Sequence, residues 1–95
     1  MGIRLTTSAQ RDIYPIAAEG LERFGEHQVA KYQTGLNNAL VFLSDYPYAA
    51  AEHREYKPPV RIYPYEAHVI IFEVSDGDVV VLAICHARED WTRLV

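Results

Sequence analysis

The only cysteine of the chain, Cys85, stands directly before His86, one of four histidines. A thiol and an imidazole perform nucleophilic catalysis when they lie within hydrogen-bond reach of each other. The pair ends the apolar run VVVLAI, which is typical of a buried strand. Neighbouring residues of a strand point to opposite faces of the sheet. The sequence therefore predicts that Cys85 is a small buried apolar residue and that it forms no dyad with His86.

A second thiol–imidazole pair depends on the register of a hairpin. The stretch SDGD, residues 75–78, favours a tight turn between two strands. An even-numbered loop at this turn places Cys85 opposite His68 and His86 opposite Ala67. A Cys85–His68 pair is kept as a minor alternative, because nothing nearby supplies an obvious carboxylate to orient the imidazole.

Three further side chains, Arg61, His86 and Arg88, lie at the expected ends of strands. Gathered into one polar spot, they could hold a phosphate and move a proton, as RNA cleavage requires. An ordinary solvated rim, or an ion-pair site for a partner, is the alternative interpretation. The four histidines lack the close spacing of metal ligands and no Gly-rich phosphate loop is present, so we expect neither a metal nor a cofactor.

The elements that would position these side chains begin with two helices. Residues 3–7 alternate apolar and polar side chains and predict a short strand. Ser8 is the expected N-cap of a first helix, which stops at Gly25. Pro15 should kink or delay that helix. Apolar residues at intervals of three and four predict a second helix over 26–45, so that the two form an antiparallel hairpin.

Three strands are expected in the second half of the chain. The polar segment 48–59 should cross the surface, and strands should follow at 60–65, 68–74 and 79–86. The tail 87–95 is expected to form one or two helical turns. The order β-α-α-β-β-β predicts a single α+β domain over residues 1–95, with a helical hairpin packed on a small antiparallel sheet and a short C-terminal tail.

Both faces of the hairpin at 68–86 are apolar in sequence. One face should carry Ile70, Phe72, Val74, Val79, Val81 and Ala83, and the other Val69, Ile71, Val80, Leu82 and Ile84. A sheet that is apolar on both sides needs cover on both, and one helical hairpin covers only one. We expect the second face to be covered by the tail, by a second copy of the chain, or by a partner that binds there.

Composition narrows the class of protein. The chain has 95 residues, 49% of them hydrophobic, and a net charge of −4. A single cysteine excludes an internal disulfide, which favours a reducing compartment. We see no signal peptide and no run long enough to span a membrane, so a soluble cytoplasmic protein is expected. The acidic balance argues against affinity based on phosphate contacts, and no direct sequence-specific binding to nucleic acid is expected.

Four stretches together resemble the ParE branch of the RelE/ParE toxin superfamily, from bacterial type II toxin–antitoxin systems. They are IRLTTSAQRDI, HQVAKYQTGLNNALVFLSDYP, RIYPYEAHVIIFEV and VVVLAICHARED, and they cover nearly the whole chain in the family's order. The most specific part is an arginine before a strand, then HVIIF, then a late strand that ends in histidine. Pro15 and the run Ala49-Ala50-Ala51 depart from the family pattern.

The resemblance implies a toxin that poisons DNA gyrase without being an enzyme, and that a ParD-like antitoxin neutralises in a hetero-oligomeric complex by wrapping over it. RelE-like relatives instead cut messenger RNA on the ribosome, and in that alternative Arg61, His86 and Arg88 would be catalytic. A degenerate, non-toxic member that keeps only antitoxin binding is a third hypothesis. For a binding toxin we predict partner contacts at Arg61, His86, Arg88 and Trp91, the last because large aromatic side chains dominate interface energies.

Overall fold

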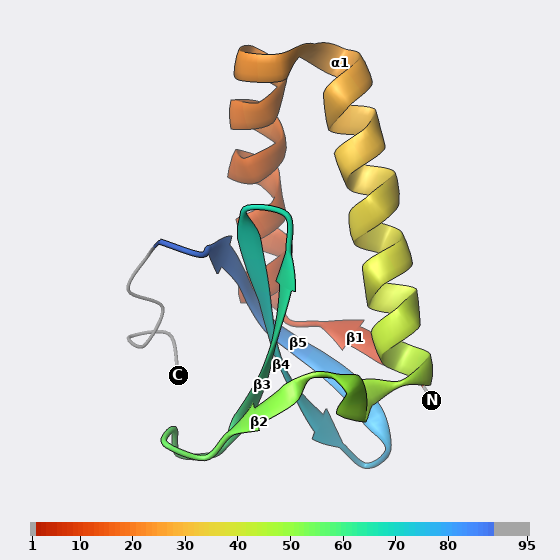
Figure 1. Cartoon of the computed structure of the whole chain (residues 1–95), viewed down its shortest axis with the longest axis vertical. Helices are drawn as coiled ribbons and strands as arrows, with labels where there is room; N and C mark the ends of the chain where they lie inside the picture. The colour runs from red at the N-terminus through yellow and green to blue at the C-terminus, as the bar shows by residue number, and fades with distance from the viewer. Residues whose placement is uncertain (1, 89–95) are drawn as a thin grey trace.

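A helical hairpin packs on one face of a five-stranded sheet (Figure 1). The computed structural model describes residues 2–88. The elements in chain order are β1 (Ile3–Leu5), α1 (Thr7–Asp45), a 3-10 turn η1 (Pro47–Ala49), β2 (Ala51–His53), β3 (Val60–Tyr65), β4 (His68–Ser75) and β5 (Asp78–His86). The strand order is β1-β5-β4-β3-β2, with β1 parallel to β5 and all other neighbours antiparallel. The predicted α+β class and helical hairpin are confirmed.

The two arms of the hairpin, residues 7–24 and 26–45, are parts of α1 that meet at Gly25. Gly25 has φ 85° and ψ 172°, outside the helical range, and only glycine adopts such a φ without strain. The predicted break at Gly25 is therefore confirmed. Pro15 lies inside the first arm, and Gly25 is the residue of α1 with non-helical backbone angles. The expected delay of the helix by Pro15 is wrong, because the arm already begins at Thr7.

The first arm begins earlier than expected because Thr6, and not Ser8, is its N-cap. The Thr6 hydroxyl accepts a hydrogen bond from the backbone N–H of Ala9 at 3.1 Å. The same residue ties the helix to the sheet, since its N–H donates to the carbonyl of Val81 at 3.0 Å and its hydroxyl donates to that of Leu82 at 3.2 Å. The strand predicted at 3–7 therefore ends at Leu5.

Strand β2 was not predicted, because three residues of mixed polarity at 51–53 carry no periodic signal. It forms by pairing with β3, with Glu52 opposite Arg61. The three later strands begin and end within one residue of the predicted bounds. The hairpin between β4 and β5 is also confirmed, because Asp76 and Gly77 both have positive φ, 53° and 81°, as a tight two-residue turn of this kind requires.

A β-bulge in β5 changes the predicted register of this hairpin. Near the turn the pairing is as expected, with Phe72 opposite Val81. The next pair is Ile71 with Ala83, so Leu82 is an extra residue on β5. Beyond the bulge Cys85 lies opposite Val69 and not His68, and His86 lies opposite His68 and not Ala67. Both predicted pairings are wrong for this one reason.

The bulge also exchanges two core residues between the faces of the sheet. Ile84, expected to share a face with Ile71, packs in the helix-side core with Ile70. Ala83, expected to share a face with Ile70, packs with Ile71 on the opposite side of the sheet. The helix-side cluster of buried residues consists of Ala9, Leu36, Leu40, Leu43, Ala50, Ile70, Phe72, Val79, Val81 and Ile84.

The second face of the sheet carries its own buried cluster. This cluster consists of Val60, Ile62, Val69, Ile71, Ala83 and Cys85, with Tyr56 and Leu82 packed against it. Both faces are thus apolar, as predicted. The expected cover by residues 89–95 lies outside the described residues. The large hydrophobic side chains that are exposed do not belong to the sheet. They lie on α1 and on the turn that follows it: Tyr14, Leu21, Phe24, Val41, Phe42, Tyr46 and Tyr48.

No helix within residues 2–88 is both long and apolar enough to cross a membrane. The same part of the chain holds no group of three or more His, Cys, Asp or Glu side chains that could bind a metal ion.

Replacing Ile84 or Leu82 by alanine tests the bulge. The two residues are two apart and would share a face in a regular strand, yet Ile84 is 1% exposed in the main core and Leu82 is only half-buried. We expect Ile84→Ala to lower the free energy of unfolding by about 2–5 kcal/mol and Leu82→Ala by about 1 kcal/mol. Urea denaturation of both variants measures the difference. Equal losses would contradict the bulged register.

Candidate functional site

A groove of about 730 Å³ runs between the two arms of α1 and the tip of the β3–β4 hairpin. Its apolar wall is built from both arms: Ile16, Ala17, Phe24 and Val29. Phe24 is 67% exposed, which is unusual for so large an apolar side chain. The hairpin tip closes the other side through residues 65–68, and His86 at the end of β5 completes one end.

Tyr32 and Tyr65 fix the hairpin tip against the second arm. The Tyr65 hydroxyl donates a hydrogen bond to the backbone carbonyl of Tyr32 at 3.0 Å, and the two rings meet edge to face at 5.1 Å. Gly35 makes this contact possible, because a Cβ at that position would collide with the Tyr65 hydroxyl. The approach of hairpin to helix therefore requires a helical glycine, which costs about 1 kcal/mol relative to alanine.

His68 is bound to the same cluster. Its Nδ1 shares a hydrogen bond of 2.9 Å with the Tyr32 hydroxyl, and the two rings also meet edge to face. Burial, reinforced by the neighbouring Tyr65 and Glu66, raises the pKa of Tyr32 to about 12. Burial and Glu66 also raise the pKa of Tyr65. Both phenols are therefore protonated at neutral pH, and that of Tyr65 donates its proton to the Tyr32 carbonyl.

His86 stands beside His68 as a consequence of the bulge. The two residues are directly opposed on β5 and β4, and their ring centroids are 5.5 Å apart. The backbone N–H of Arg88 donates to Nδ1 of His86 at 3.1 Å. Because Nδ1 accepts this bond, neutral His86 carries its proton on Nε2 and presents it as a donor.

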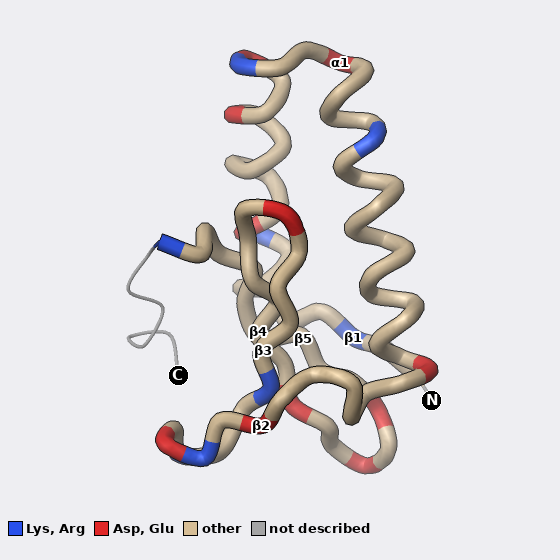
Figure 2. Tube along the Cα trace, viewed as in Figure 1, with Lys and Arg blue, Asp and Glu red and all other residues tan. Residues whose placement is uncertain are grey.

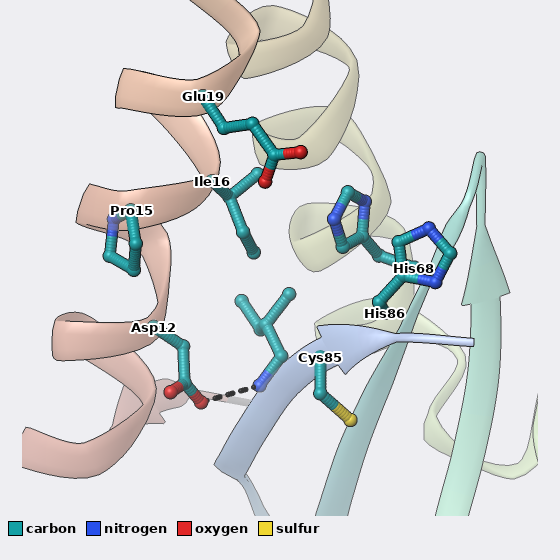
Figure 3. Close-up of a pocket in the computed structure, with 8 residues that line it drawn as sticks. Asp12, Pro15, Ile16, Glu19, His68, Cys85 and His86 are labelled. Atoms are coloured by element: carbon teal, nitrogen blue, oxygen red, sulfur yellow. Dashed lines mark hydrogen bonds between the residues drawn. The ribbon is translucent and has the colours of Figure 1, made fainter. Parts of the chain in front are cut away.

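A smaller pocket of about 220 Å³ adjoins the groove beside the two histidines (Figure 3). Ile16, Glu19, His68 and His86 line both hollows. Asp12 lies at the base of the smaller one and accepts a hydrogen bond from the backbone N–H of Ile84 at 3.0 Å. Strand β1 pairs with β5 only as far as Val81, so it cannot bond the backbone of Ile84. The Asp12 carboxylate takes the place of this strand as the acceptor for the Ile84 N–H.

The Cys85 side chain points to the other face of the sheet from the two histidines. It is 5% exposed and belongs to the buried cluster on the face away from the helices, which confirms the prediction of a small buried apolar residue. Figure 3 shows its sulfur directed away from His68 and His86. The alternative Cys85–His68 pair is removed by the register of β5.

Arg61 and His86 lie toward opposite ends of the sheet. Arg61 pairs with Phe72, which is opposite Val81, so that His86 lies five positions further along β5, roughly 15 Å away. The Arg61 guanidinium donates to the carbonyl of Ala50 at 2.7 Å and lies 4.8 Å from the ring centroid of Tyr48. A single polar spot made of Arg61, His86 and Arg88 is therefore not formed.

Arg88 is exposed and follows the end of β5 by two residues. The hydrogen bond from its backbone N–H to His86 holds it close to the groove. Trp91 lies outside the described residues. Sequence reasoning missed Tyr32, Tyr65, Asp12 and Glu19 as parts of the site. Tyr32 was visible only as one member of an apolar helical stripe, and Asp12 only as a polar residue of the first helix.

The arrangement suits binding of an apolar segment. The groove offers aliphatic and aromatic surface, and the hydrogen-bonded pair of Tyr32 and His68 lies with His86 at one end of it. Such a groove, apolar with a few convergent polar groups, is the usual form of a binding site for a ligand or a helix.

Comparisons with known proteins identify the family and support the fold. A sequence model of the family described as "ParE toxin of type II toxin-antitoxin system, parDE" matches residues 3–91. Among solved structures, the chromosomal ParDE toxin–antitoxin system from P. aeruginosa is similar, with a TM-score of 0.77 and 19% sequence identity over 90% of this chain and 95% of that one. At this identity the likeness concerns the fold. A search of curated proteins finds no match.

Replacing Tyr32 by phenylalanine tests the hydrogen-bonded cluster. The folded chain keeps the Tyr32 proton to a pKa of about 12, whereas the unfolded chain loses it near the ordinary value of 10.0. The stabilisation from this group is therefore complete below pH 10.0 and is lost as pH rises towards 12. We expect the wild-type stability to fall over this range and the fall to be smaller in Tyr32→Phe. Denaturation at a series of pH values measures both, and identical slopes would contradict the assignment.

Proposed function

Because this chain belongs to the ParE toxin family of type II toxin–antitoxin systems, we propose that it inhibits DNA gyrase and that a ParD-like antitoxin neutralises it. The family match over residues 3–91 is the observation that carries this proposal. Gyrase and its DNA substrate are cytoplasmic, so the toxin would act there.

The groove supports neutralisation by a protein partner. An amphipathic helix binds by laying its apolar face into a hydrophobic groove, with anchors three or four residues apart. The groove here is open along both arms of α1 and includes the exposed Phe24. We assign the antitoxin to it, with His86 and the adjacent Arg88 among the proposed contacts.

Arg61 supports a separate partner contact. Its guanidinium lies over Tyr48, which is 65% exposed, and the neighbouring Phe42 packs against both Tyr46 and Tyr63. Tyrosine, phenylalanine and arginine are enriched at protein interfaces. We propose that this surface, at the other end of the sheet from His86, is available to a second protein.

The alternative of a messenger-RNA nuclease is less well supported. It would need Arg61, His86 and Arg88 to act on one phosphate, and the sheet keeps Arg61 away from the other two. The net charge of −4 also opposes binding to a ribosome, whose surface is dense with phosphate. We therefore propose a binding toxin and not an enzyme.

A supercoiling and cleavage assay tests the proposal. Purified protein at micromolar concentration, incubated with gyrase, DNA and ATP, should trap cleaved DNA. Addition of the antitoxin encoded beside it should abolish the effect. Normal supercoiling without trapped DNA would refute gyrase inhibition, and a stable antitoxin complex of such an inactive protein would identify a non-toxic member that only binds its antitoxin.

A triple variant separates the binding toxin from the nuclease. Arg61→Ala, His86→Ala and Arg88→Ala together remove every candidate group for phosphate binding and proton transfer. New cuts in messenger RNA on purified ribosomes that vanish in the variant would establish the nuclease. We expect no such cuts from the wild-type protein, while far-ultraviolet circular dichroism confirms that the variant is folded.

A further inference from the structure

The first arm of α1 carries a second apolar stripe beside the one that faces the sheet. Its core-facing stripe consists of Ala9, which is fully buried, and of Ile13 and Ile16, which pack against the same core. Tyr14 and Leu21 lie seven positions apart on a neighbouring face of the helix. They are 78% and 49% exposed, so no described part of the chain covers this second stripe.

Ala17 and Phe24 complete the second stripe at the spacing of a coiled-coil seam. Residues 14, 17, 21 and 24 recur at intervals of three and four, which keeps them on one face of a helix. Phe24 is 67% exposed and lines the groove together with Ala17. Tyr14 and Leu21 line neither hollow, so the stripe continues around the arm beyond the site that we assign to the antitoxin.

The middle of the stripe is small and uncharged. Residues 13–18 include no charged side chain (Figure 2), and Ala17 and Ala18 stand next to each other at its centre. Small side chains let two helix axes approach to about 8 Å. In an antiparallel pair of arms with a two-fold axis between these alanines, Tyr14 of each copy lies opposite Leu21 of the other. The stripe is therefore complementary to itself.

Two exposed charges, Arg11 and Glu22, flank the stripe, one towards each of its ends. They are eleven positions apart, or about three turns, so they lie on the same flank of the helix and about 16 Å from each other. In the antiparallel pair, Glu22 of the second copy comes within about 3 Å of Arg11 along the helix axis. A parallel pair would instead place arginine beside arginine and glutamate beside glutamate. The charges thus favour an antiparallel second copy.

The other charged side chains of the first arm point away from the stripe. Asp12, Glu19 and Arg23 lie roughly 140–180° around the helix from Tyr14. Each lines one of the two hollows, and Glu19 and Arg23 form an ion pair at 3.3 Å. Pairing along the stripe therefore brings together only the two flanking charges of each copy, which are opposite in sign.

The size of the stripe sets the expected strength of the pair. Tyr14 and Phe24 can each bury on the order of 150 Å², so the four rings of two copies account for roughly 600 Å². Stable interfaces bury a total of about 1,200 Å² or more. Leu21 and the flanking side chains add to the area of the rings, and we expect a dissociation constant in the micromolar range.

We propose that two copies of the chain associate through the first arms of α1, antiparallel and related by a two-fold axis between Ala17 and Ala18. Tyr14 packs against Leu21 of the other copy, and Arg11 pairs with Glu22 of the other copy. Each contact occurs twice, because a two-fold axis makes the interface isologous. The association goes beyond the proposed function, since neither gyrase nor the antitoxin takes part in it.

Sedimentation equilibrium of the purified chain measures the association. The average mass of the wild-type chain should rise from that of one copy towards that of two over micromolar concentrations. Leu21→Ser should weaken the association about tenfold. Val41→Ser, on the second arm, is the matched control, because Val41 is 51% exposed and Leu21 is 49% exposed. We expect it to change the association less than about twofold.

Two results would overturn the proposal. One is a wild-type chain that stays monomeric up to about 100 μM, and the other is an equal effect of Leu21→Ser and Val41→Ser. A monomeric chain whose affinity for the antitoxin falls in Leu21→Ser would assign the stripe to the antitoxin instead. Far-ultraviolet circular dichroism confirms that both variants are folded.

Charge reversal tests the antiparallel arrangement. Arg11→Glu alone and Glu22→Arg alone should each weaken the association about tenfold, because each places like charges together at two symmetric positions. The double variant should return to within about twofold of the wild-type affinity. The two side chains of one copy are too far apart to pair with each other, so this recovery reports a contact between copies. A double variant as weak as the single ones would overturn the antiparallel arrangement.

Discussion

The arrangement of the site depends on how the backbone of β5 is held where β1 no longer reaches it. Strand β1 pairs with β5 through only three residues, and the bulge at Leu82 follows immediately. Two side chains from the start of α1 take over the exposed backbone groups: the Thr6 hydroxyl bonds the Leu82 carbonyl, and Asp12 bonds the Ile84 N–H. A bulge leaves backbone groups unpaired, and unpaired buried groups are costly. The helix start therefore stabilises the irregularity that brings His86 to His68.

Much of the fold follows from local signals. Gly25 ends the first arm, the SDGD turn joins β4 to β5, and the apolar runs mark three strands almost to the residue. These features depend on near neighbours in the chain, so a sequence pattern records them. No sequence pattern records the parallel pairing of β1 or the existence of β2. Each arises from contact with another strand, β5 for β1 and β3 for β2.

The candidate site was predicted less well than the fold, and one extra residue explains most of the difference. Strand side chains alternate, so a single bulge exchanges the faces of everything beyond it. That exchange moved Ile84 into the main core and separated Cys85 from His68. Nothing in the run VVVLAICH distinguishes Leu82 as the extra residue, since every neighbour is equally apolar. Arg61 was placed correctly on its strand, but its distance from His86 depended on pairing across three strands.

The parallel pairing of β1 with β5 joins the first and the last of the described strands. Ile3 lies opposite Val79, so β1 can pair only after the ribosome has added the 76 residues that separate the two positions. During synthesis the chain lengthens by about 5–20 residues per second, and contacts of such long sequence separation form late in folding. The arms of α1 can form on the ribosome, but the sheet is completed only after β5 has emerged. A nascent chain that lacks β5 thus has neither the His68–His86 pair nor the end of the groove that His86 lines.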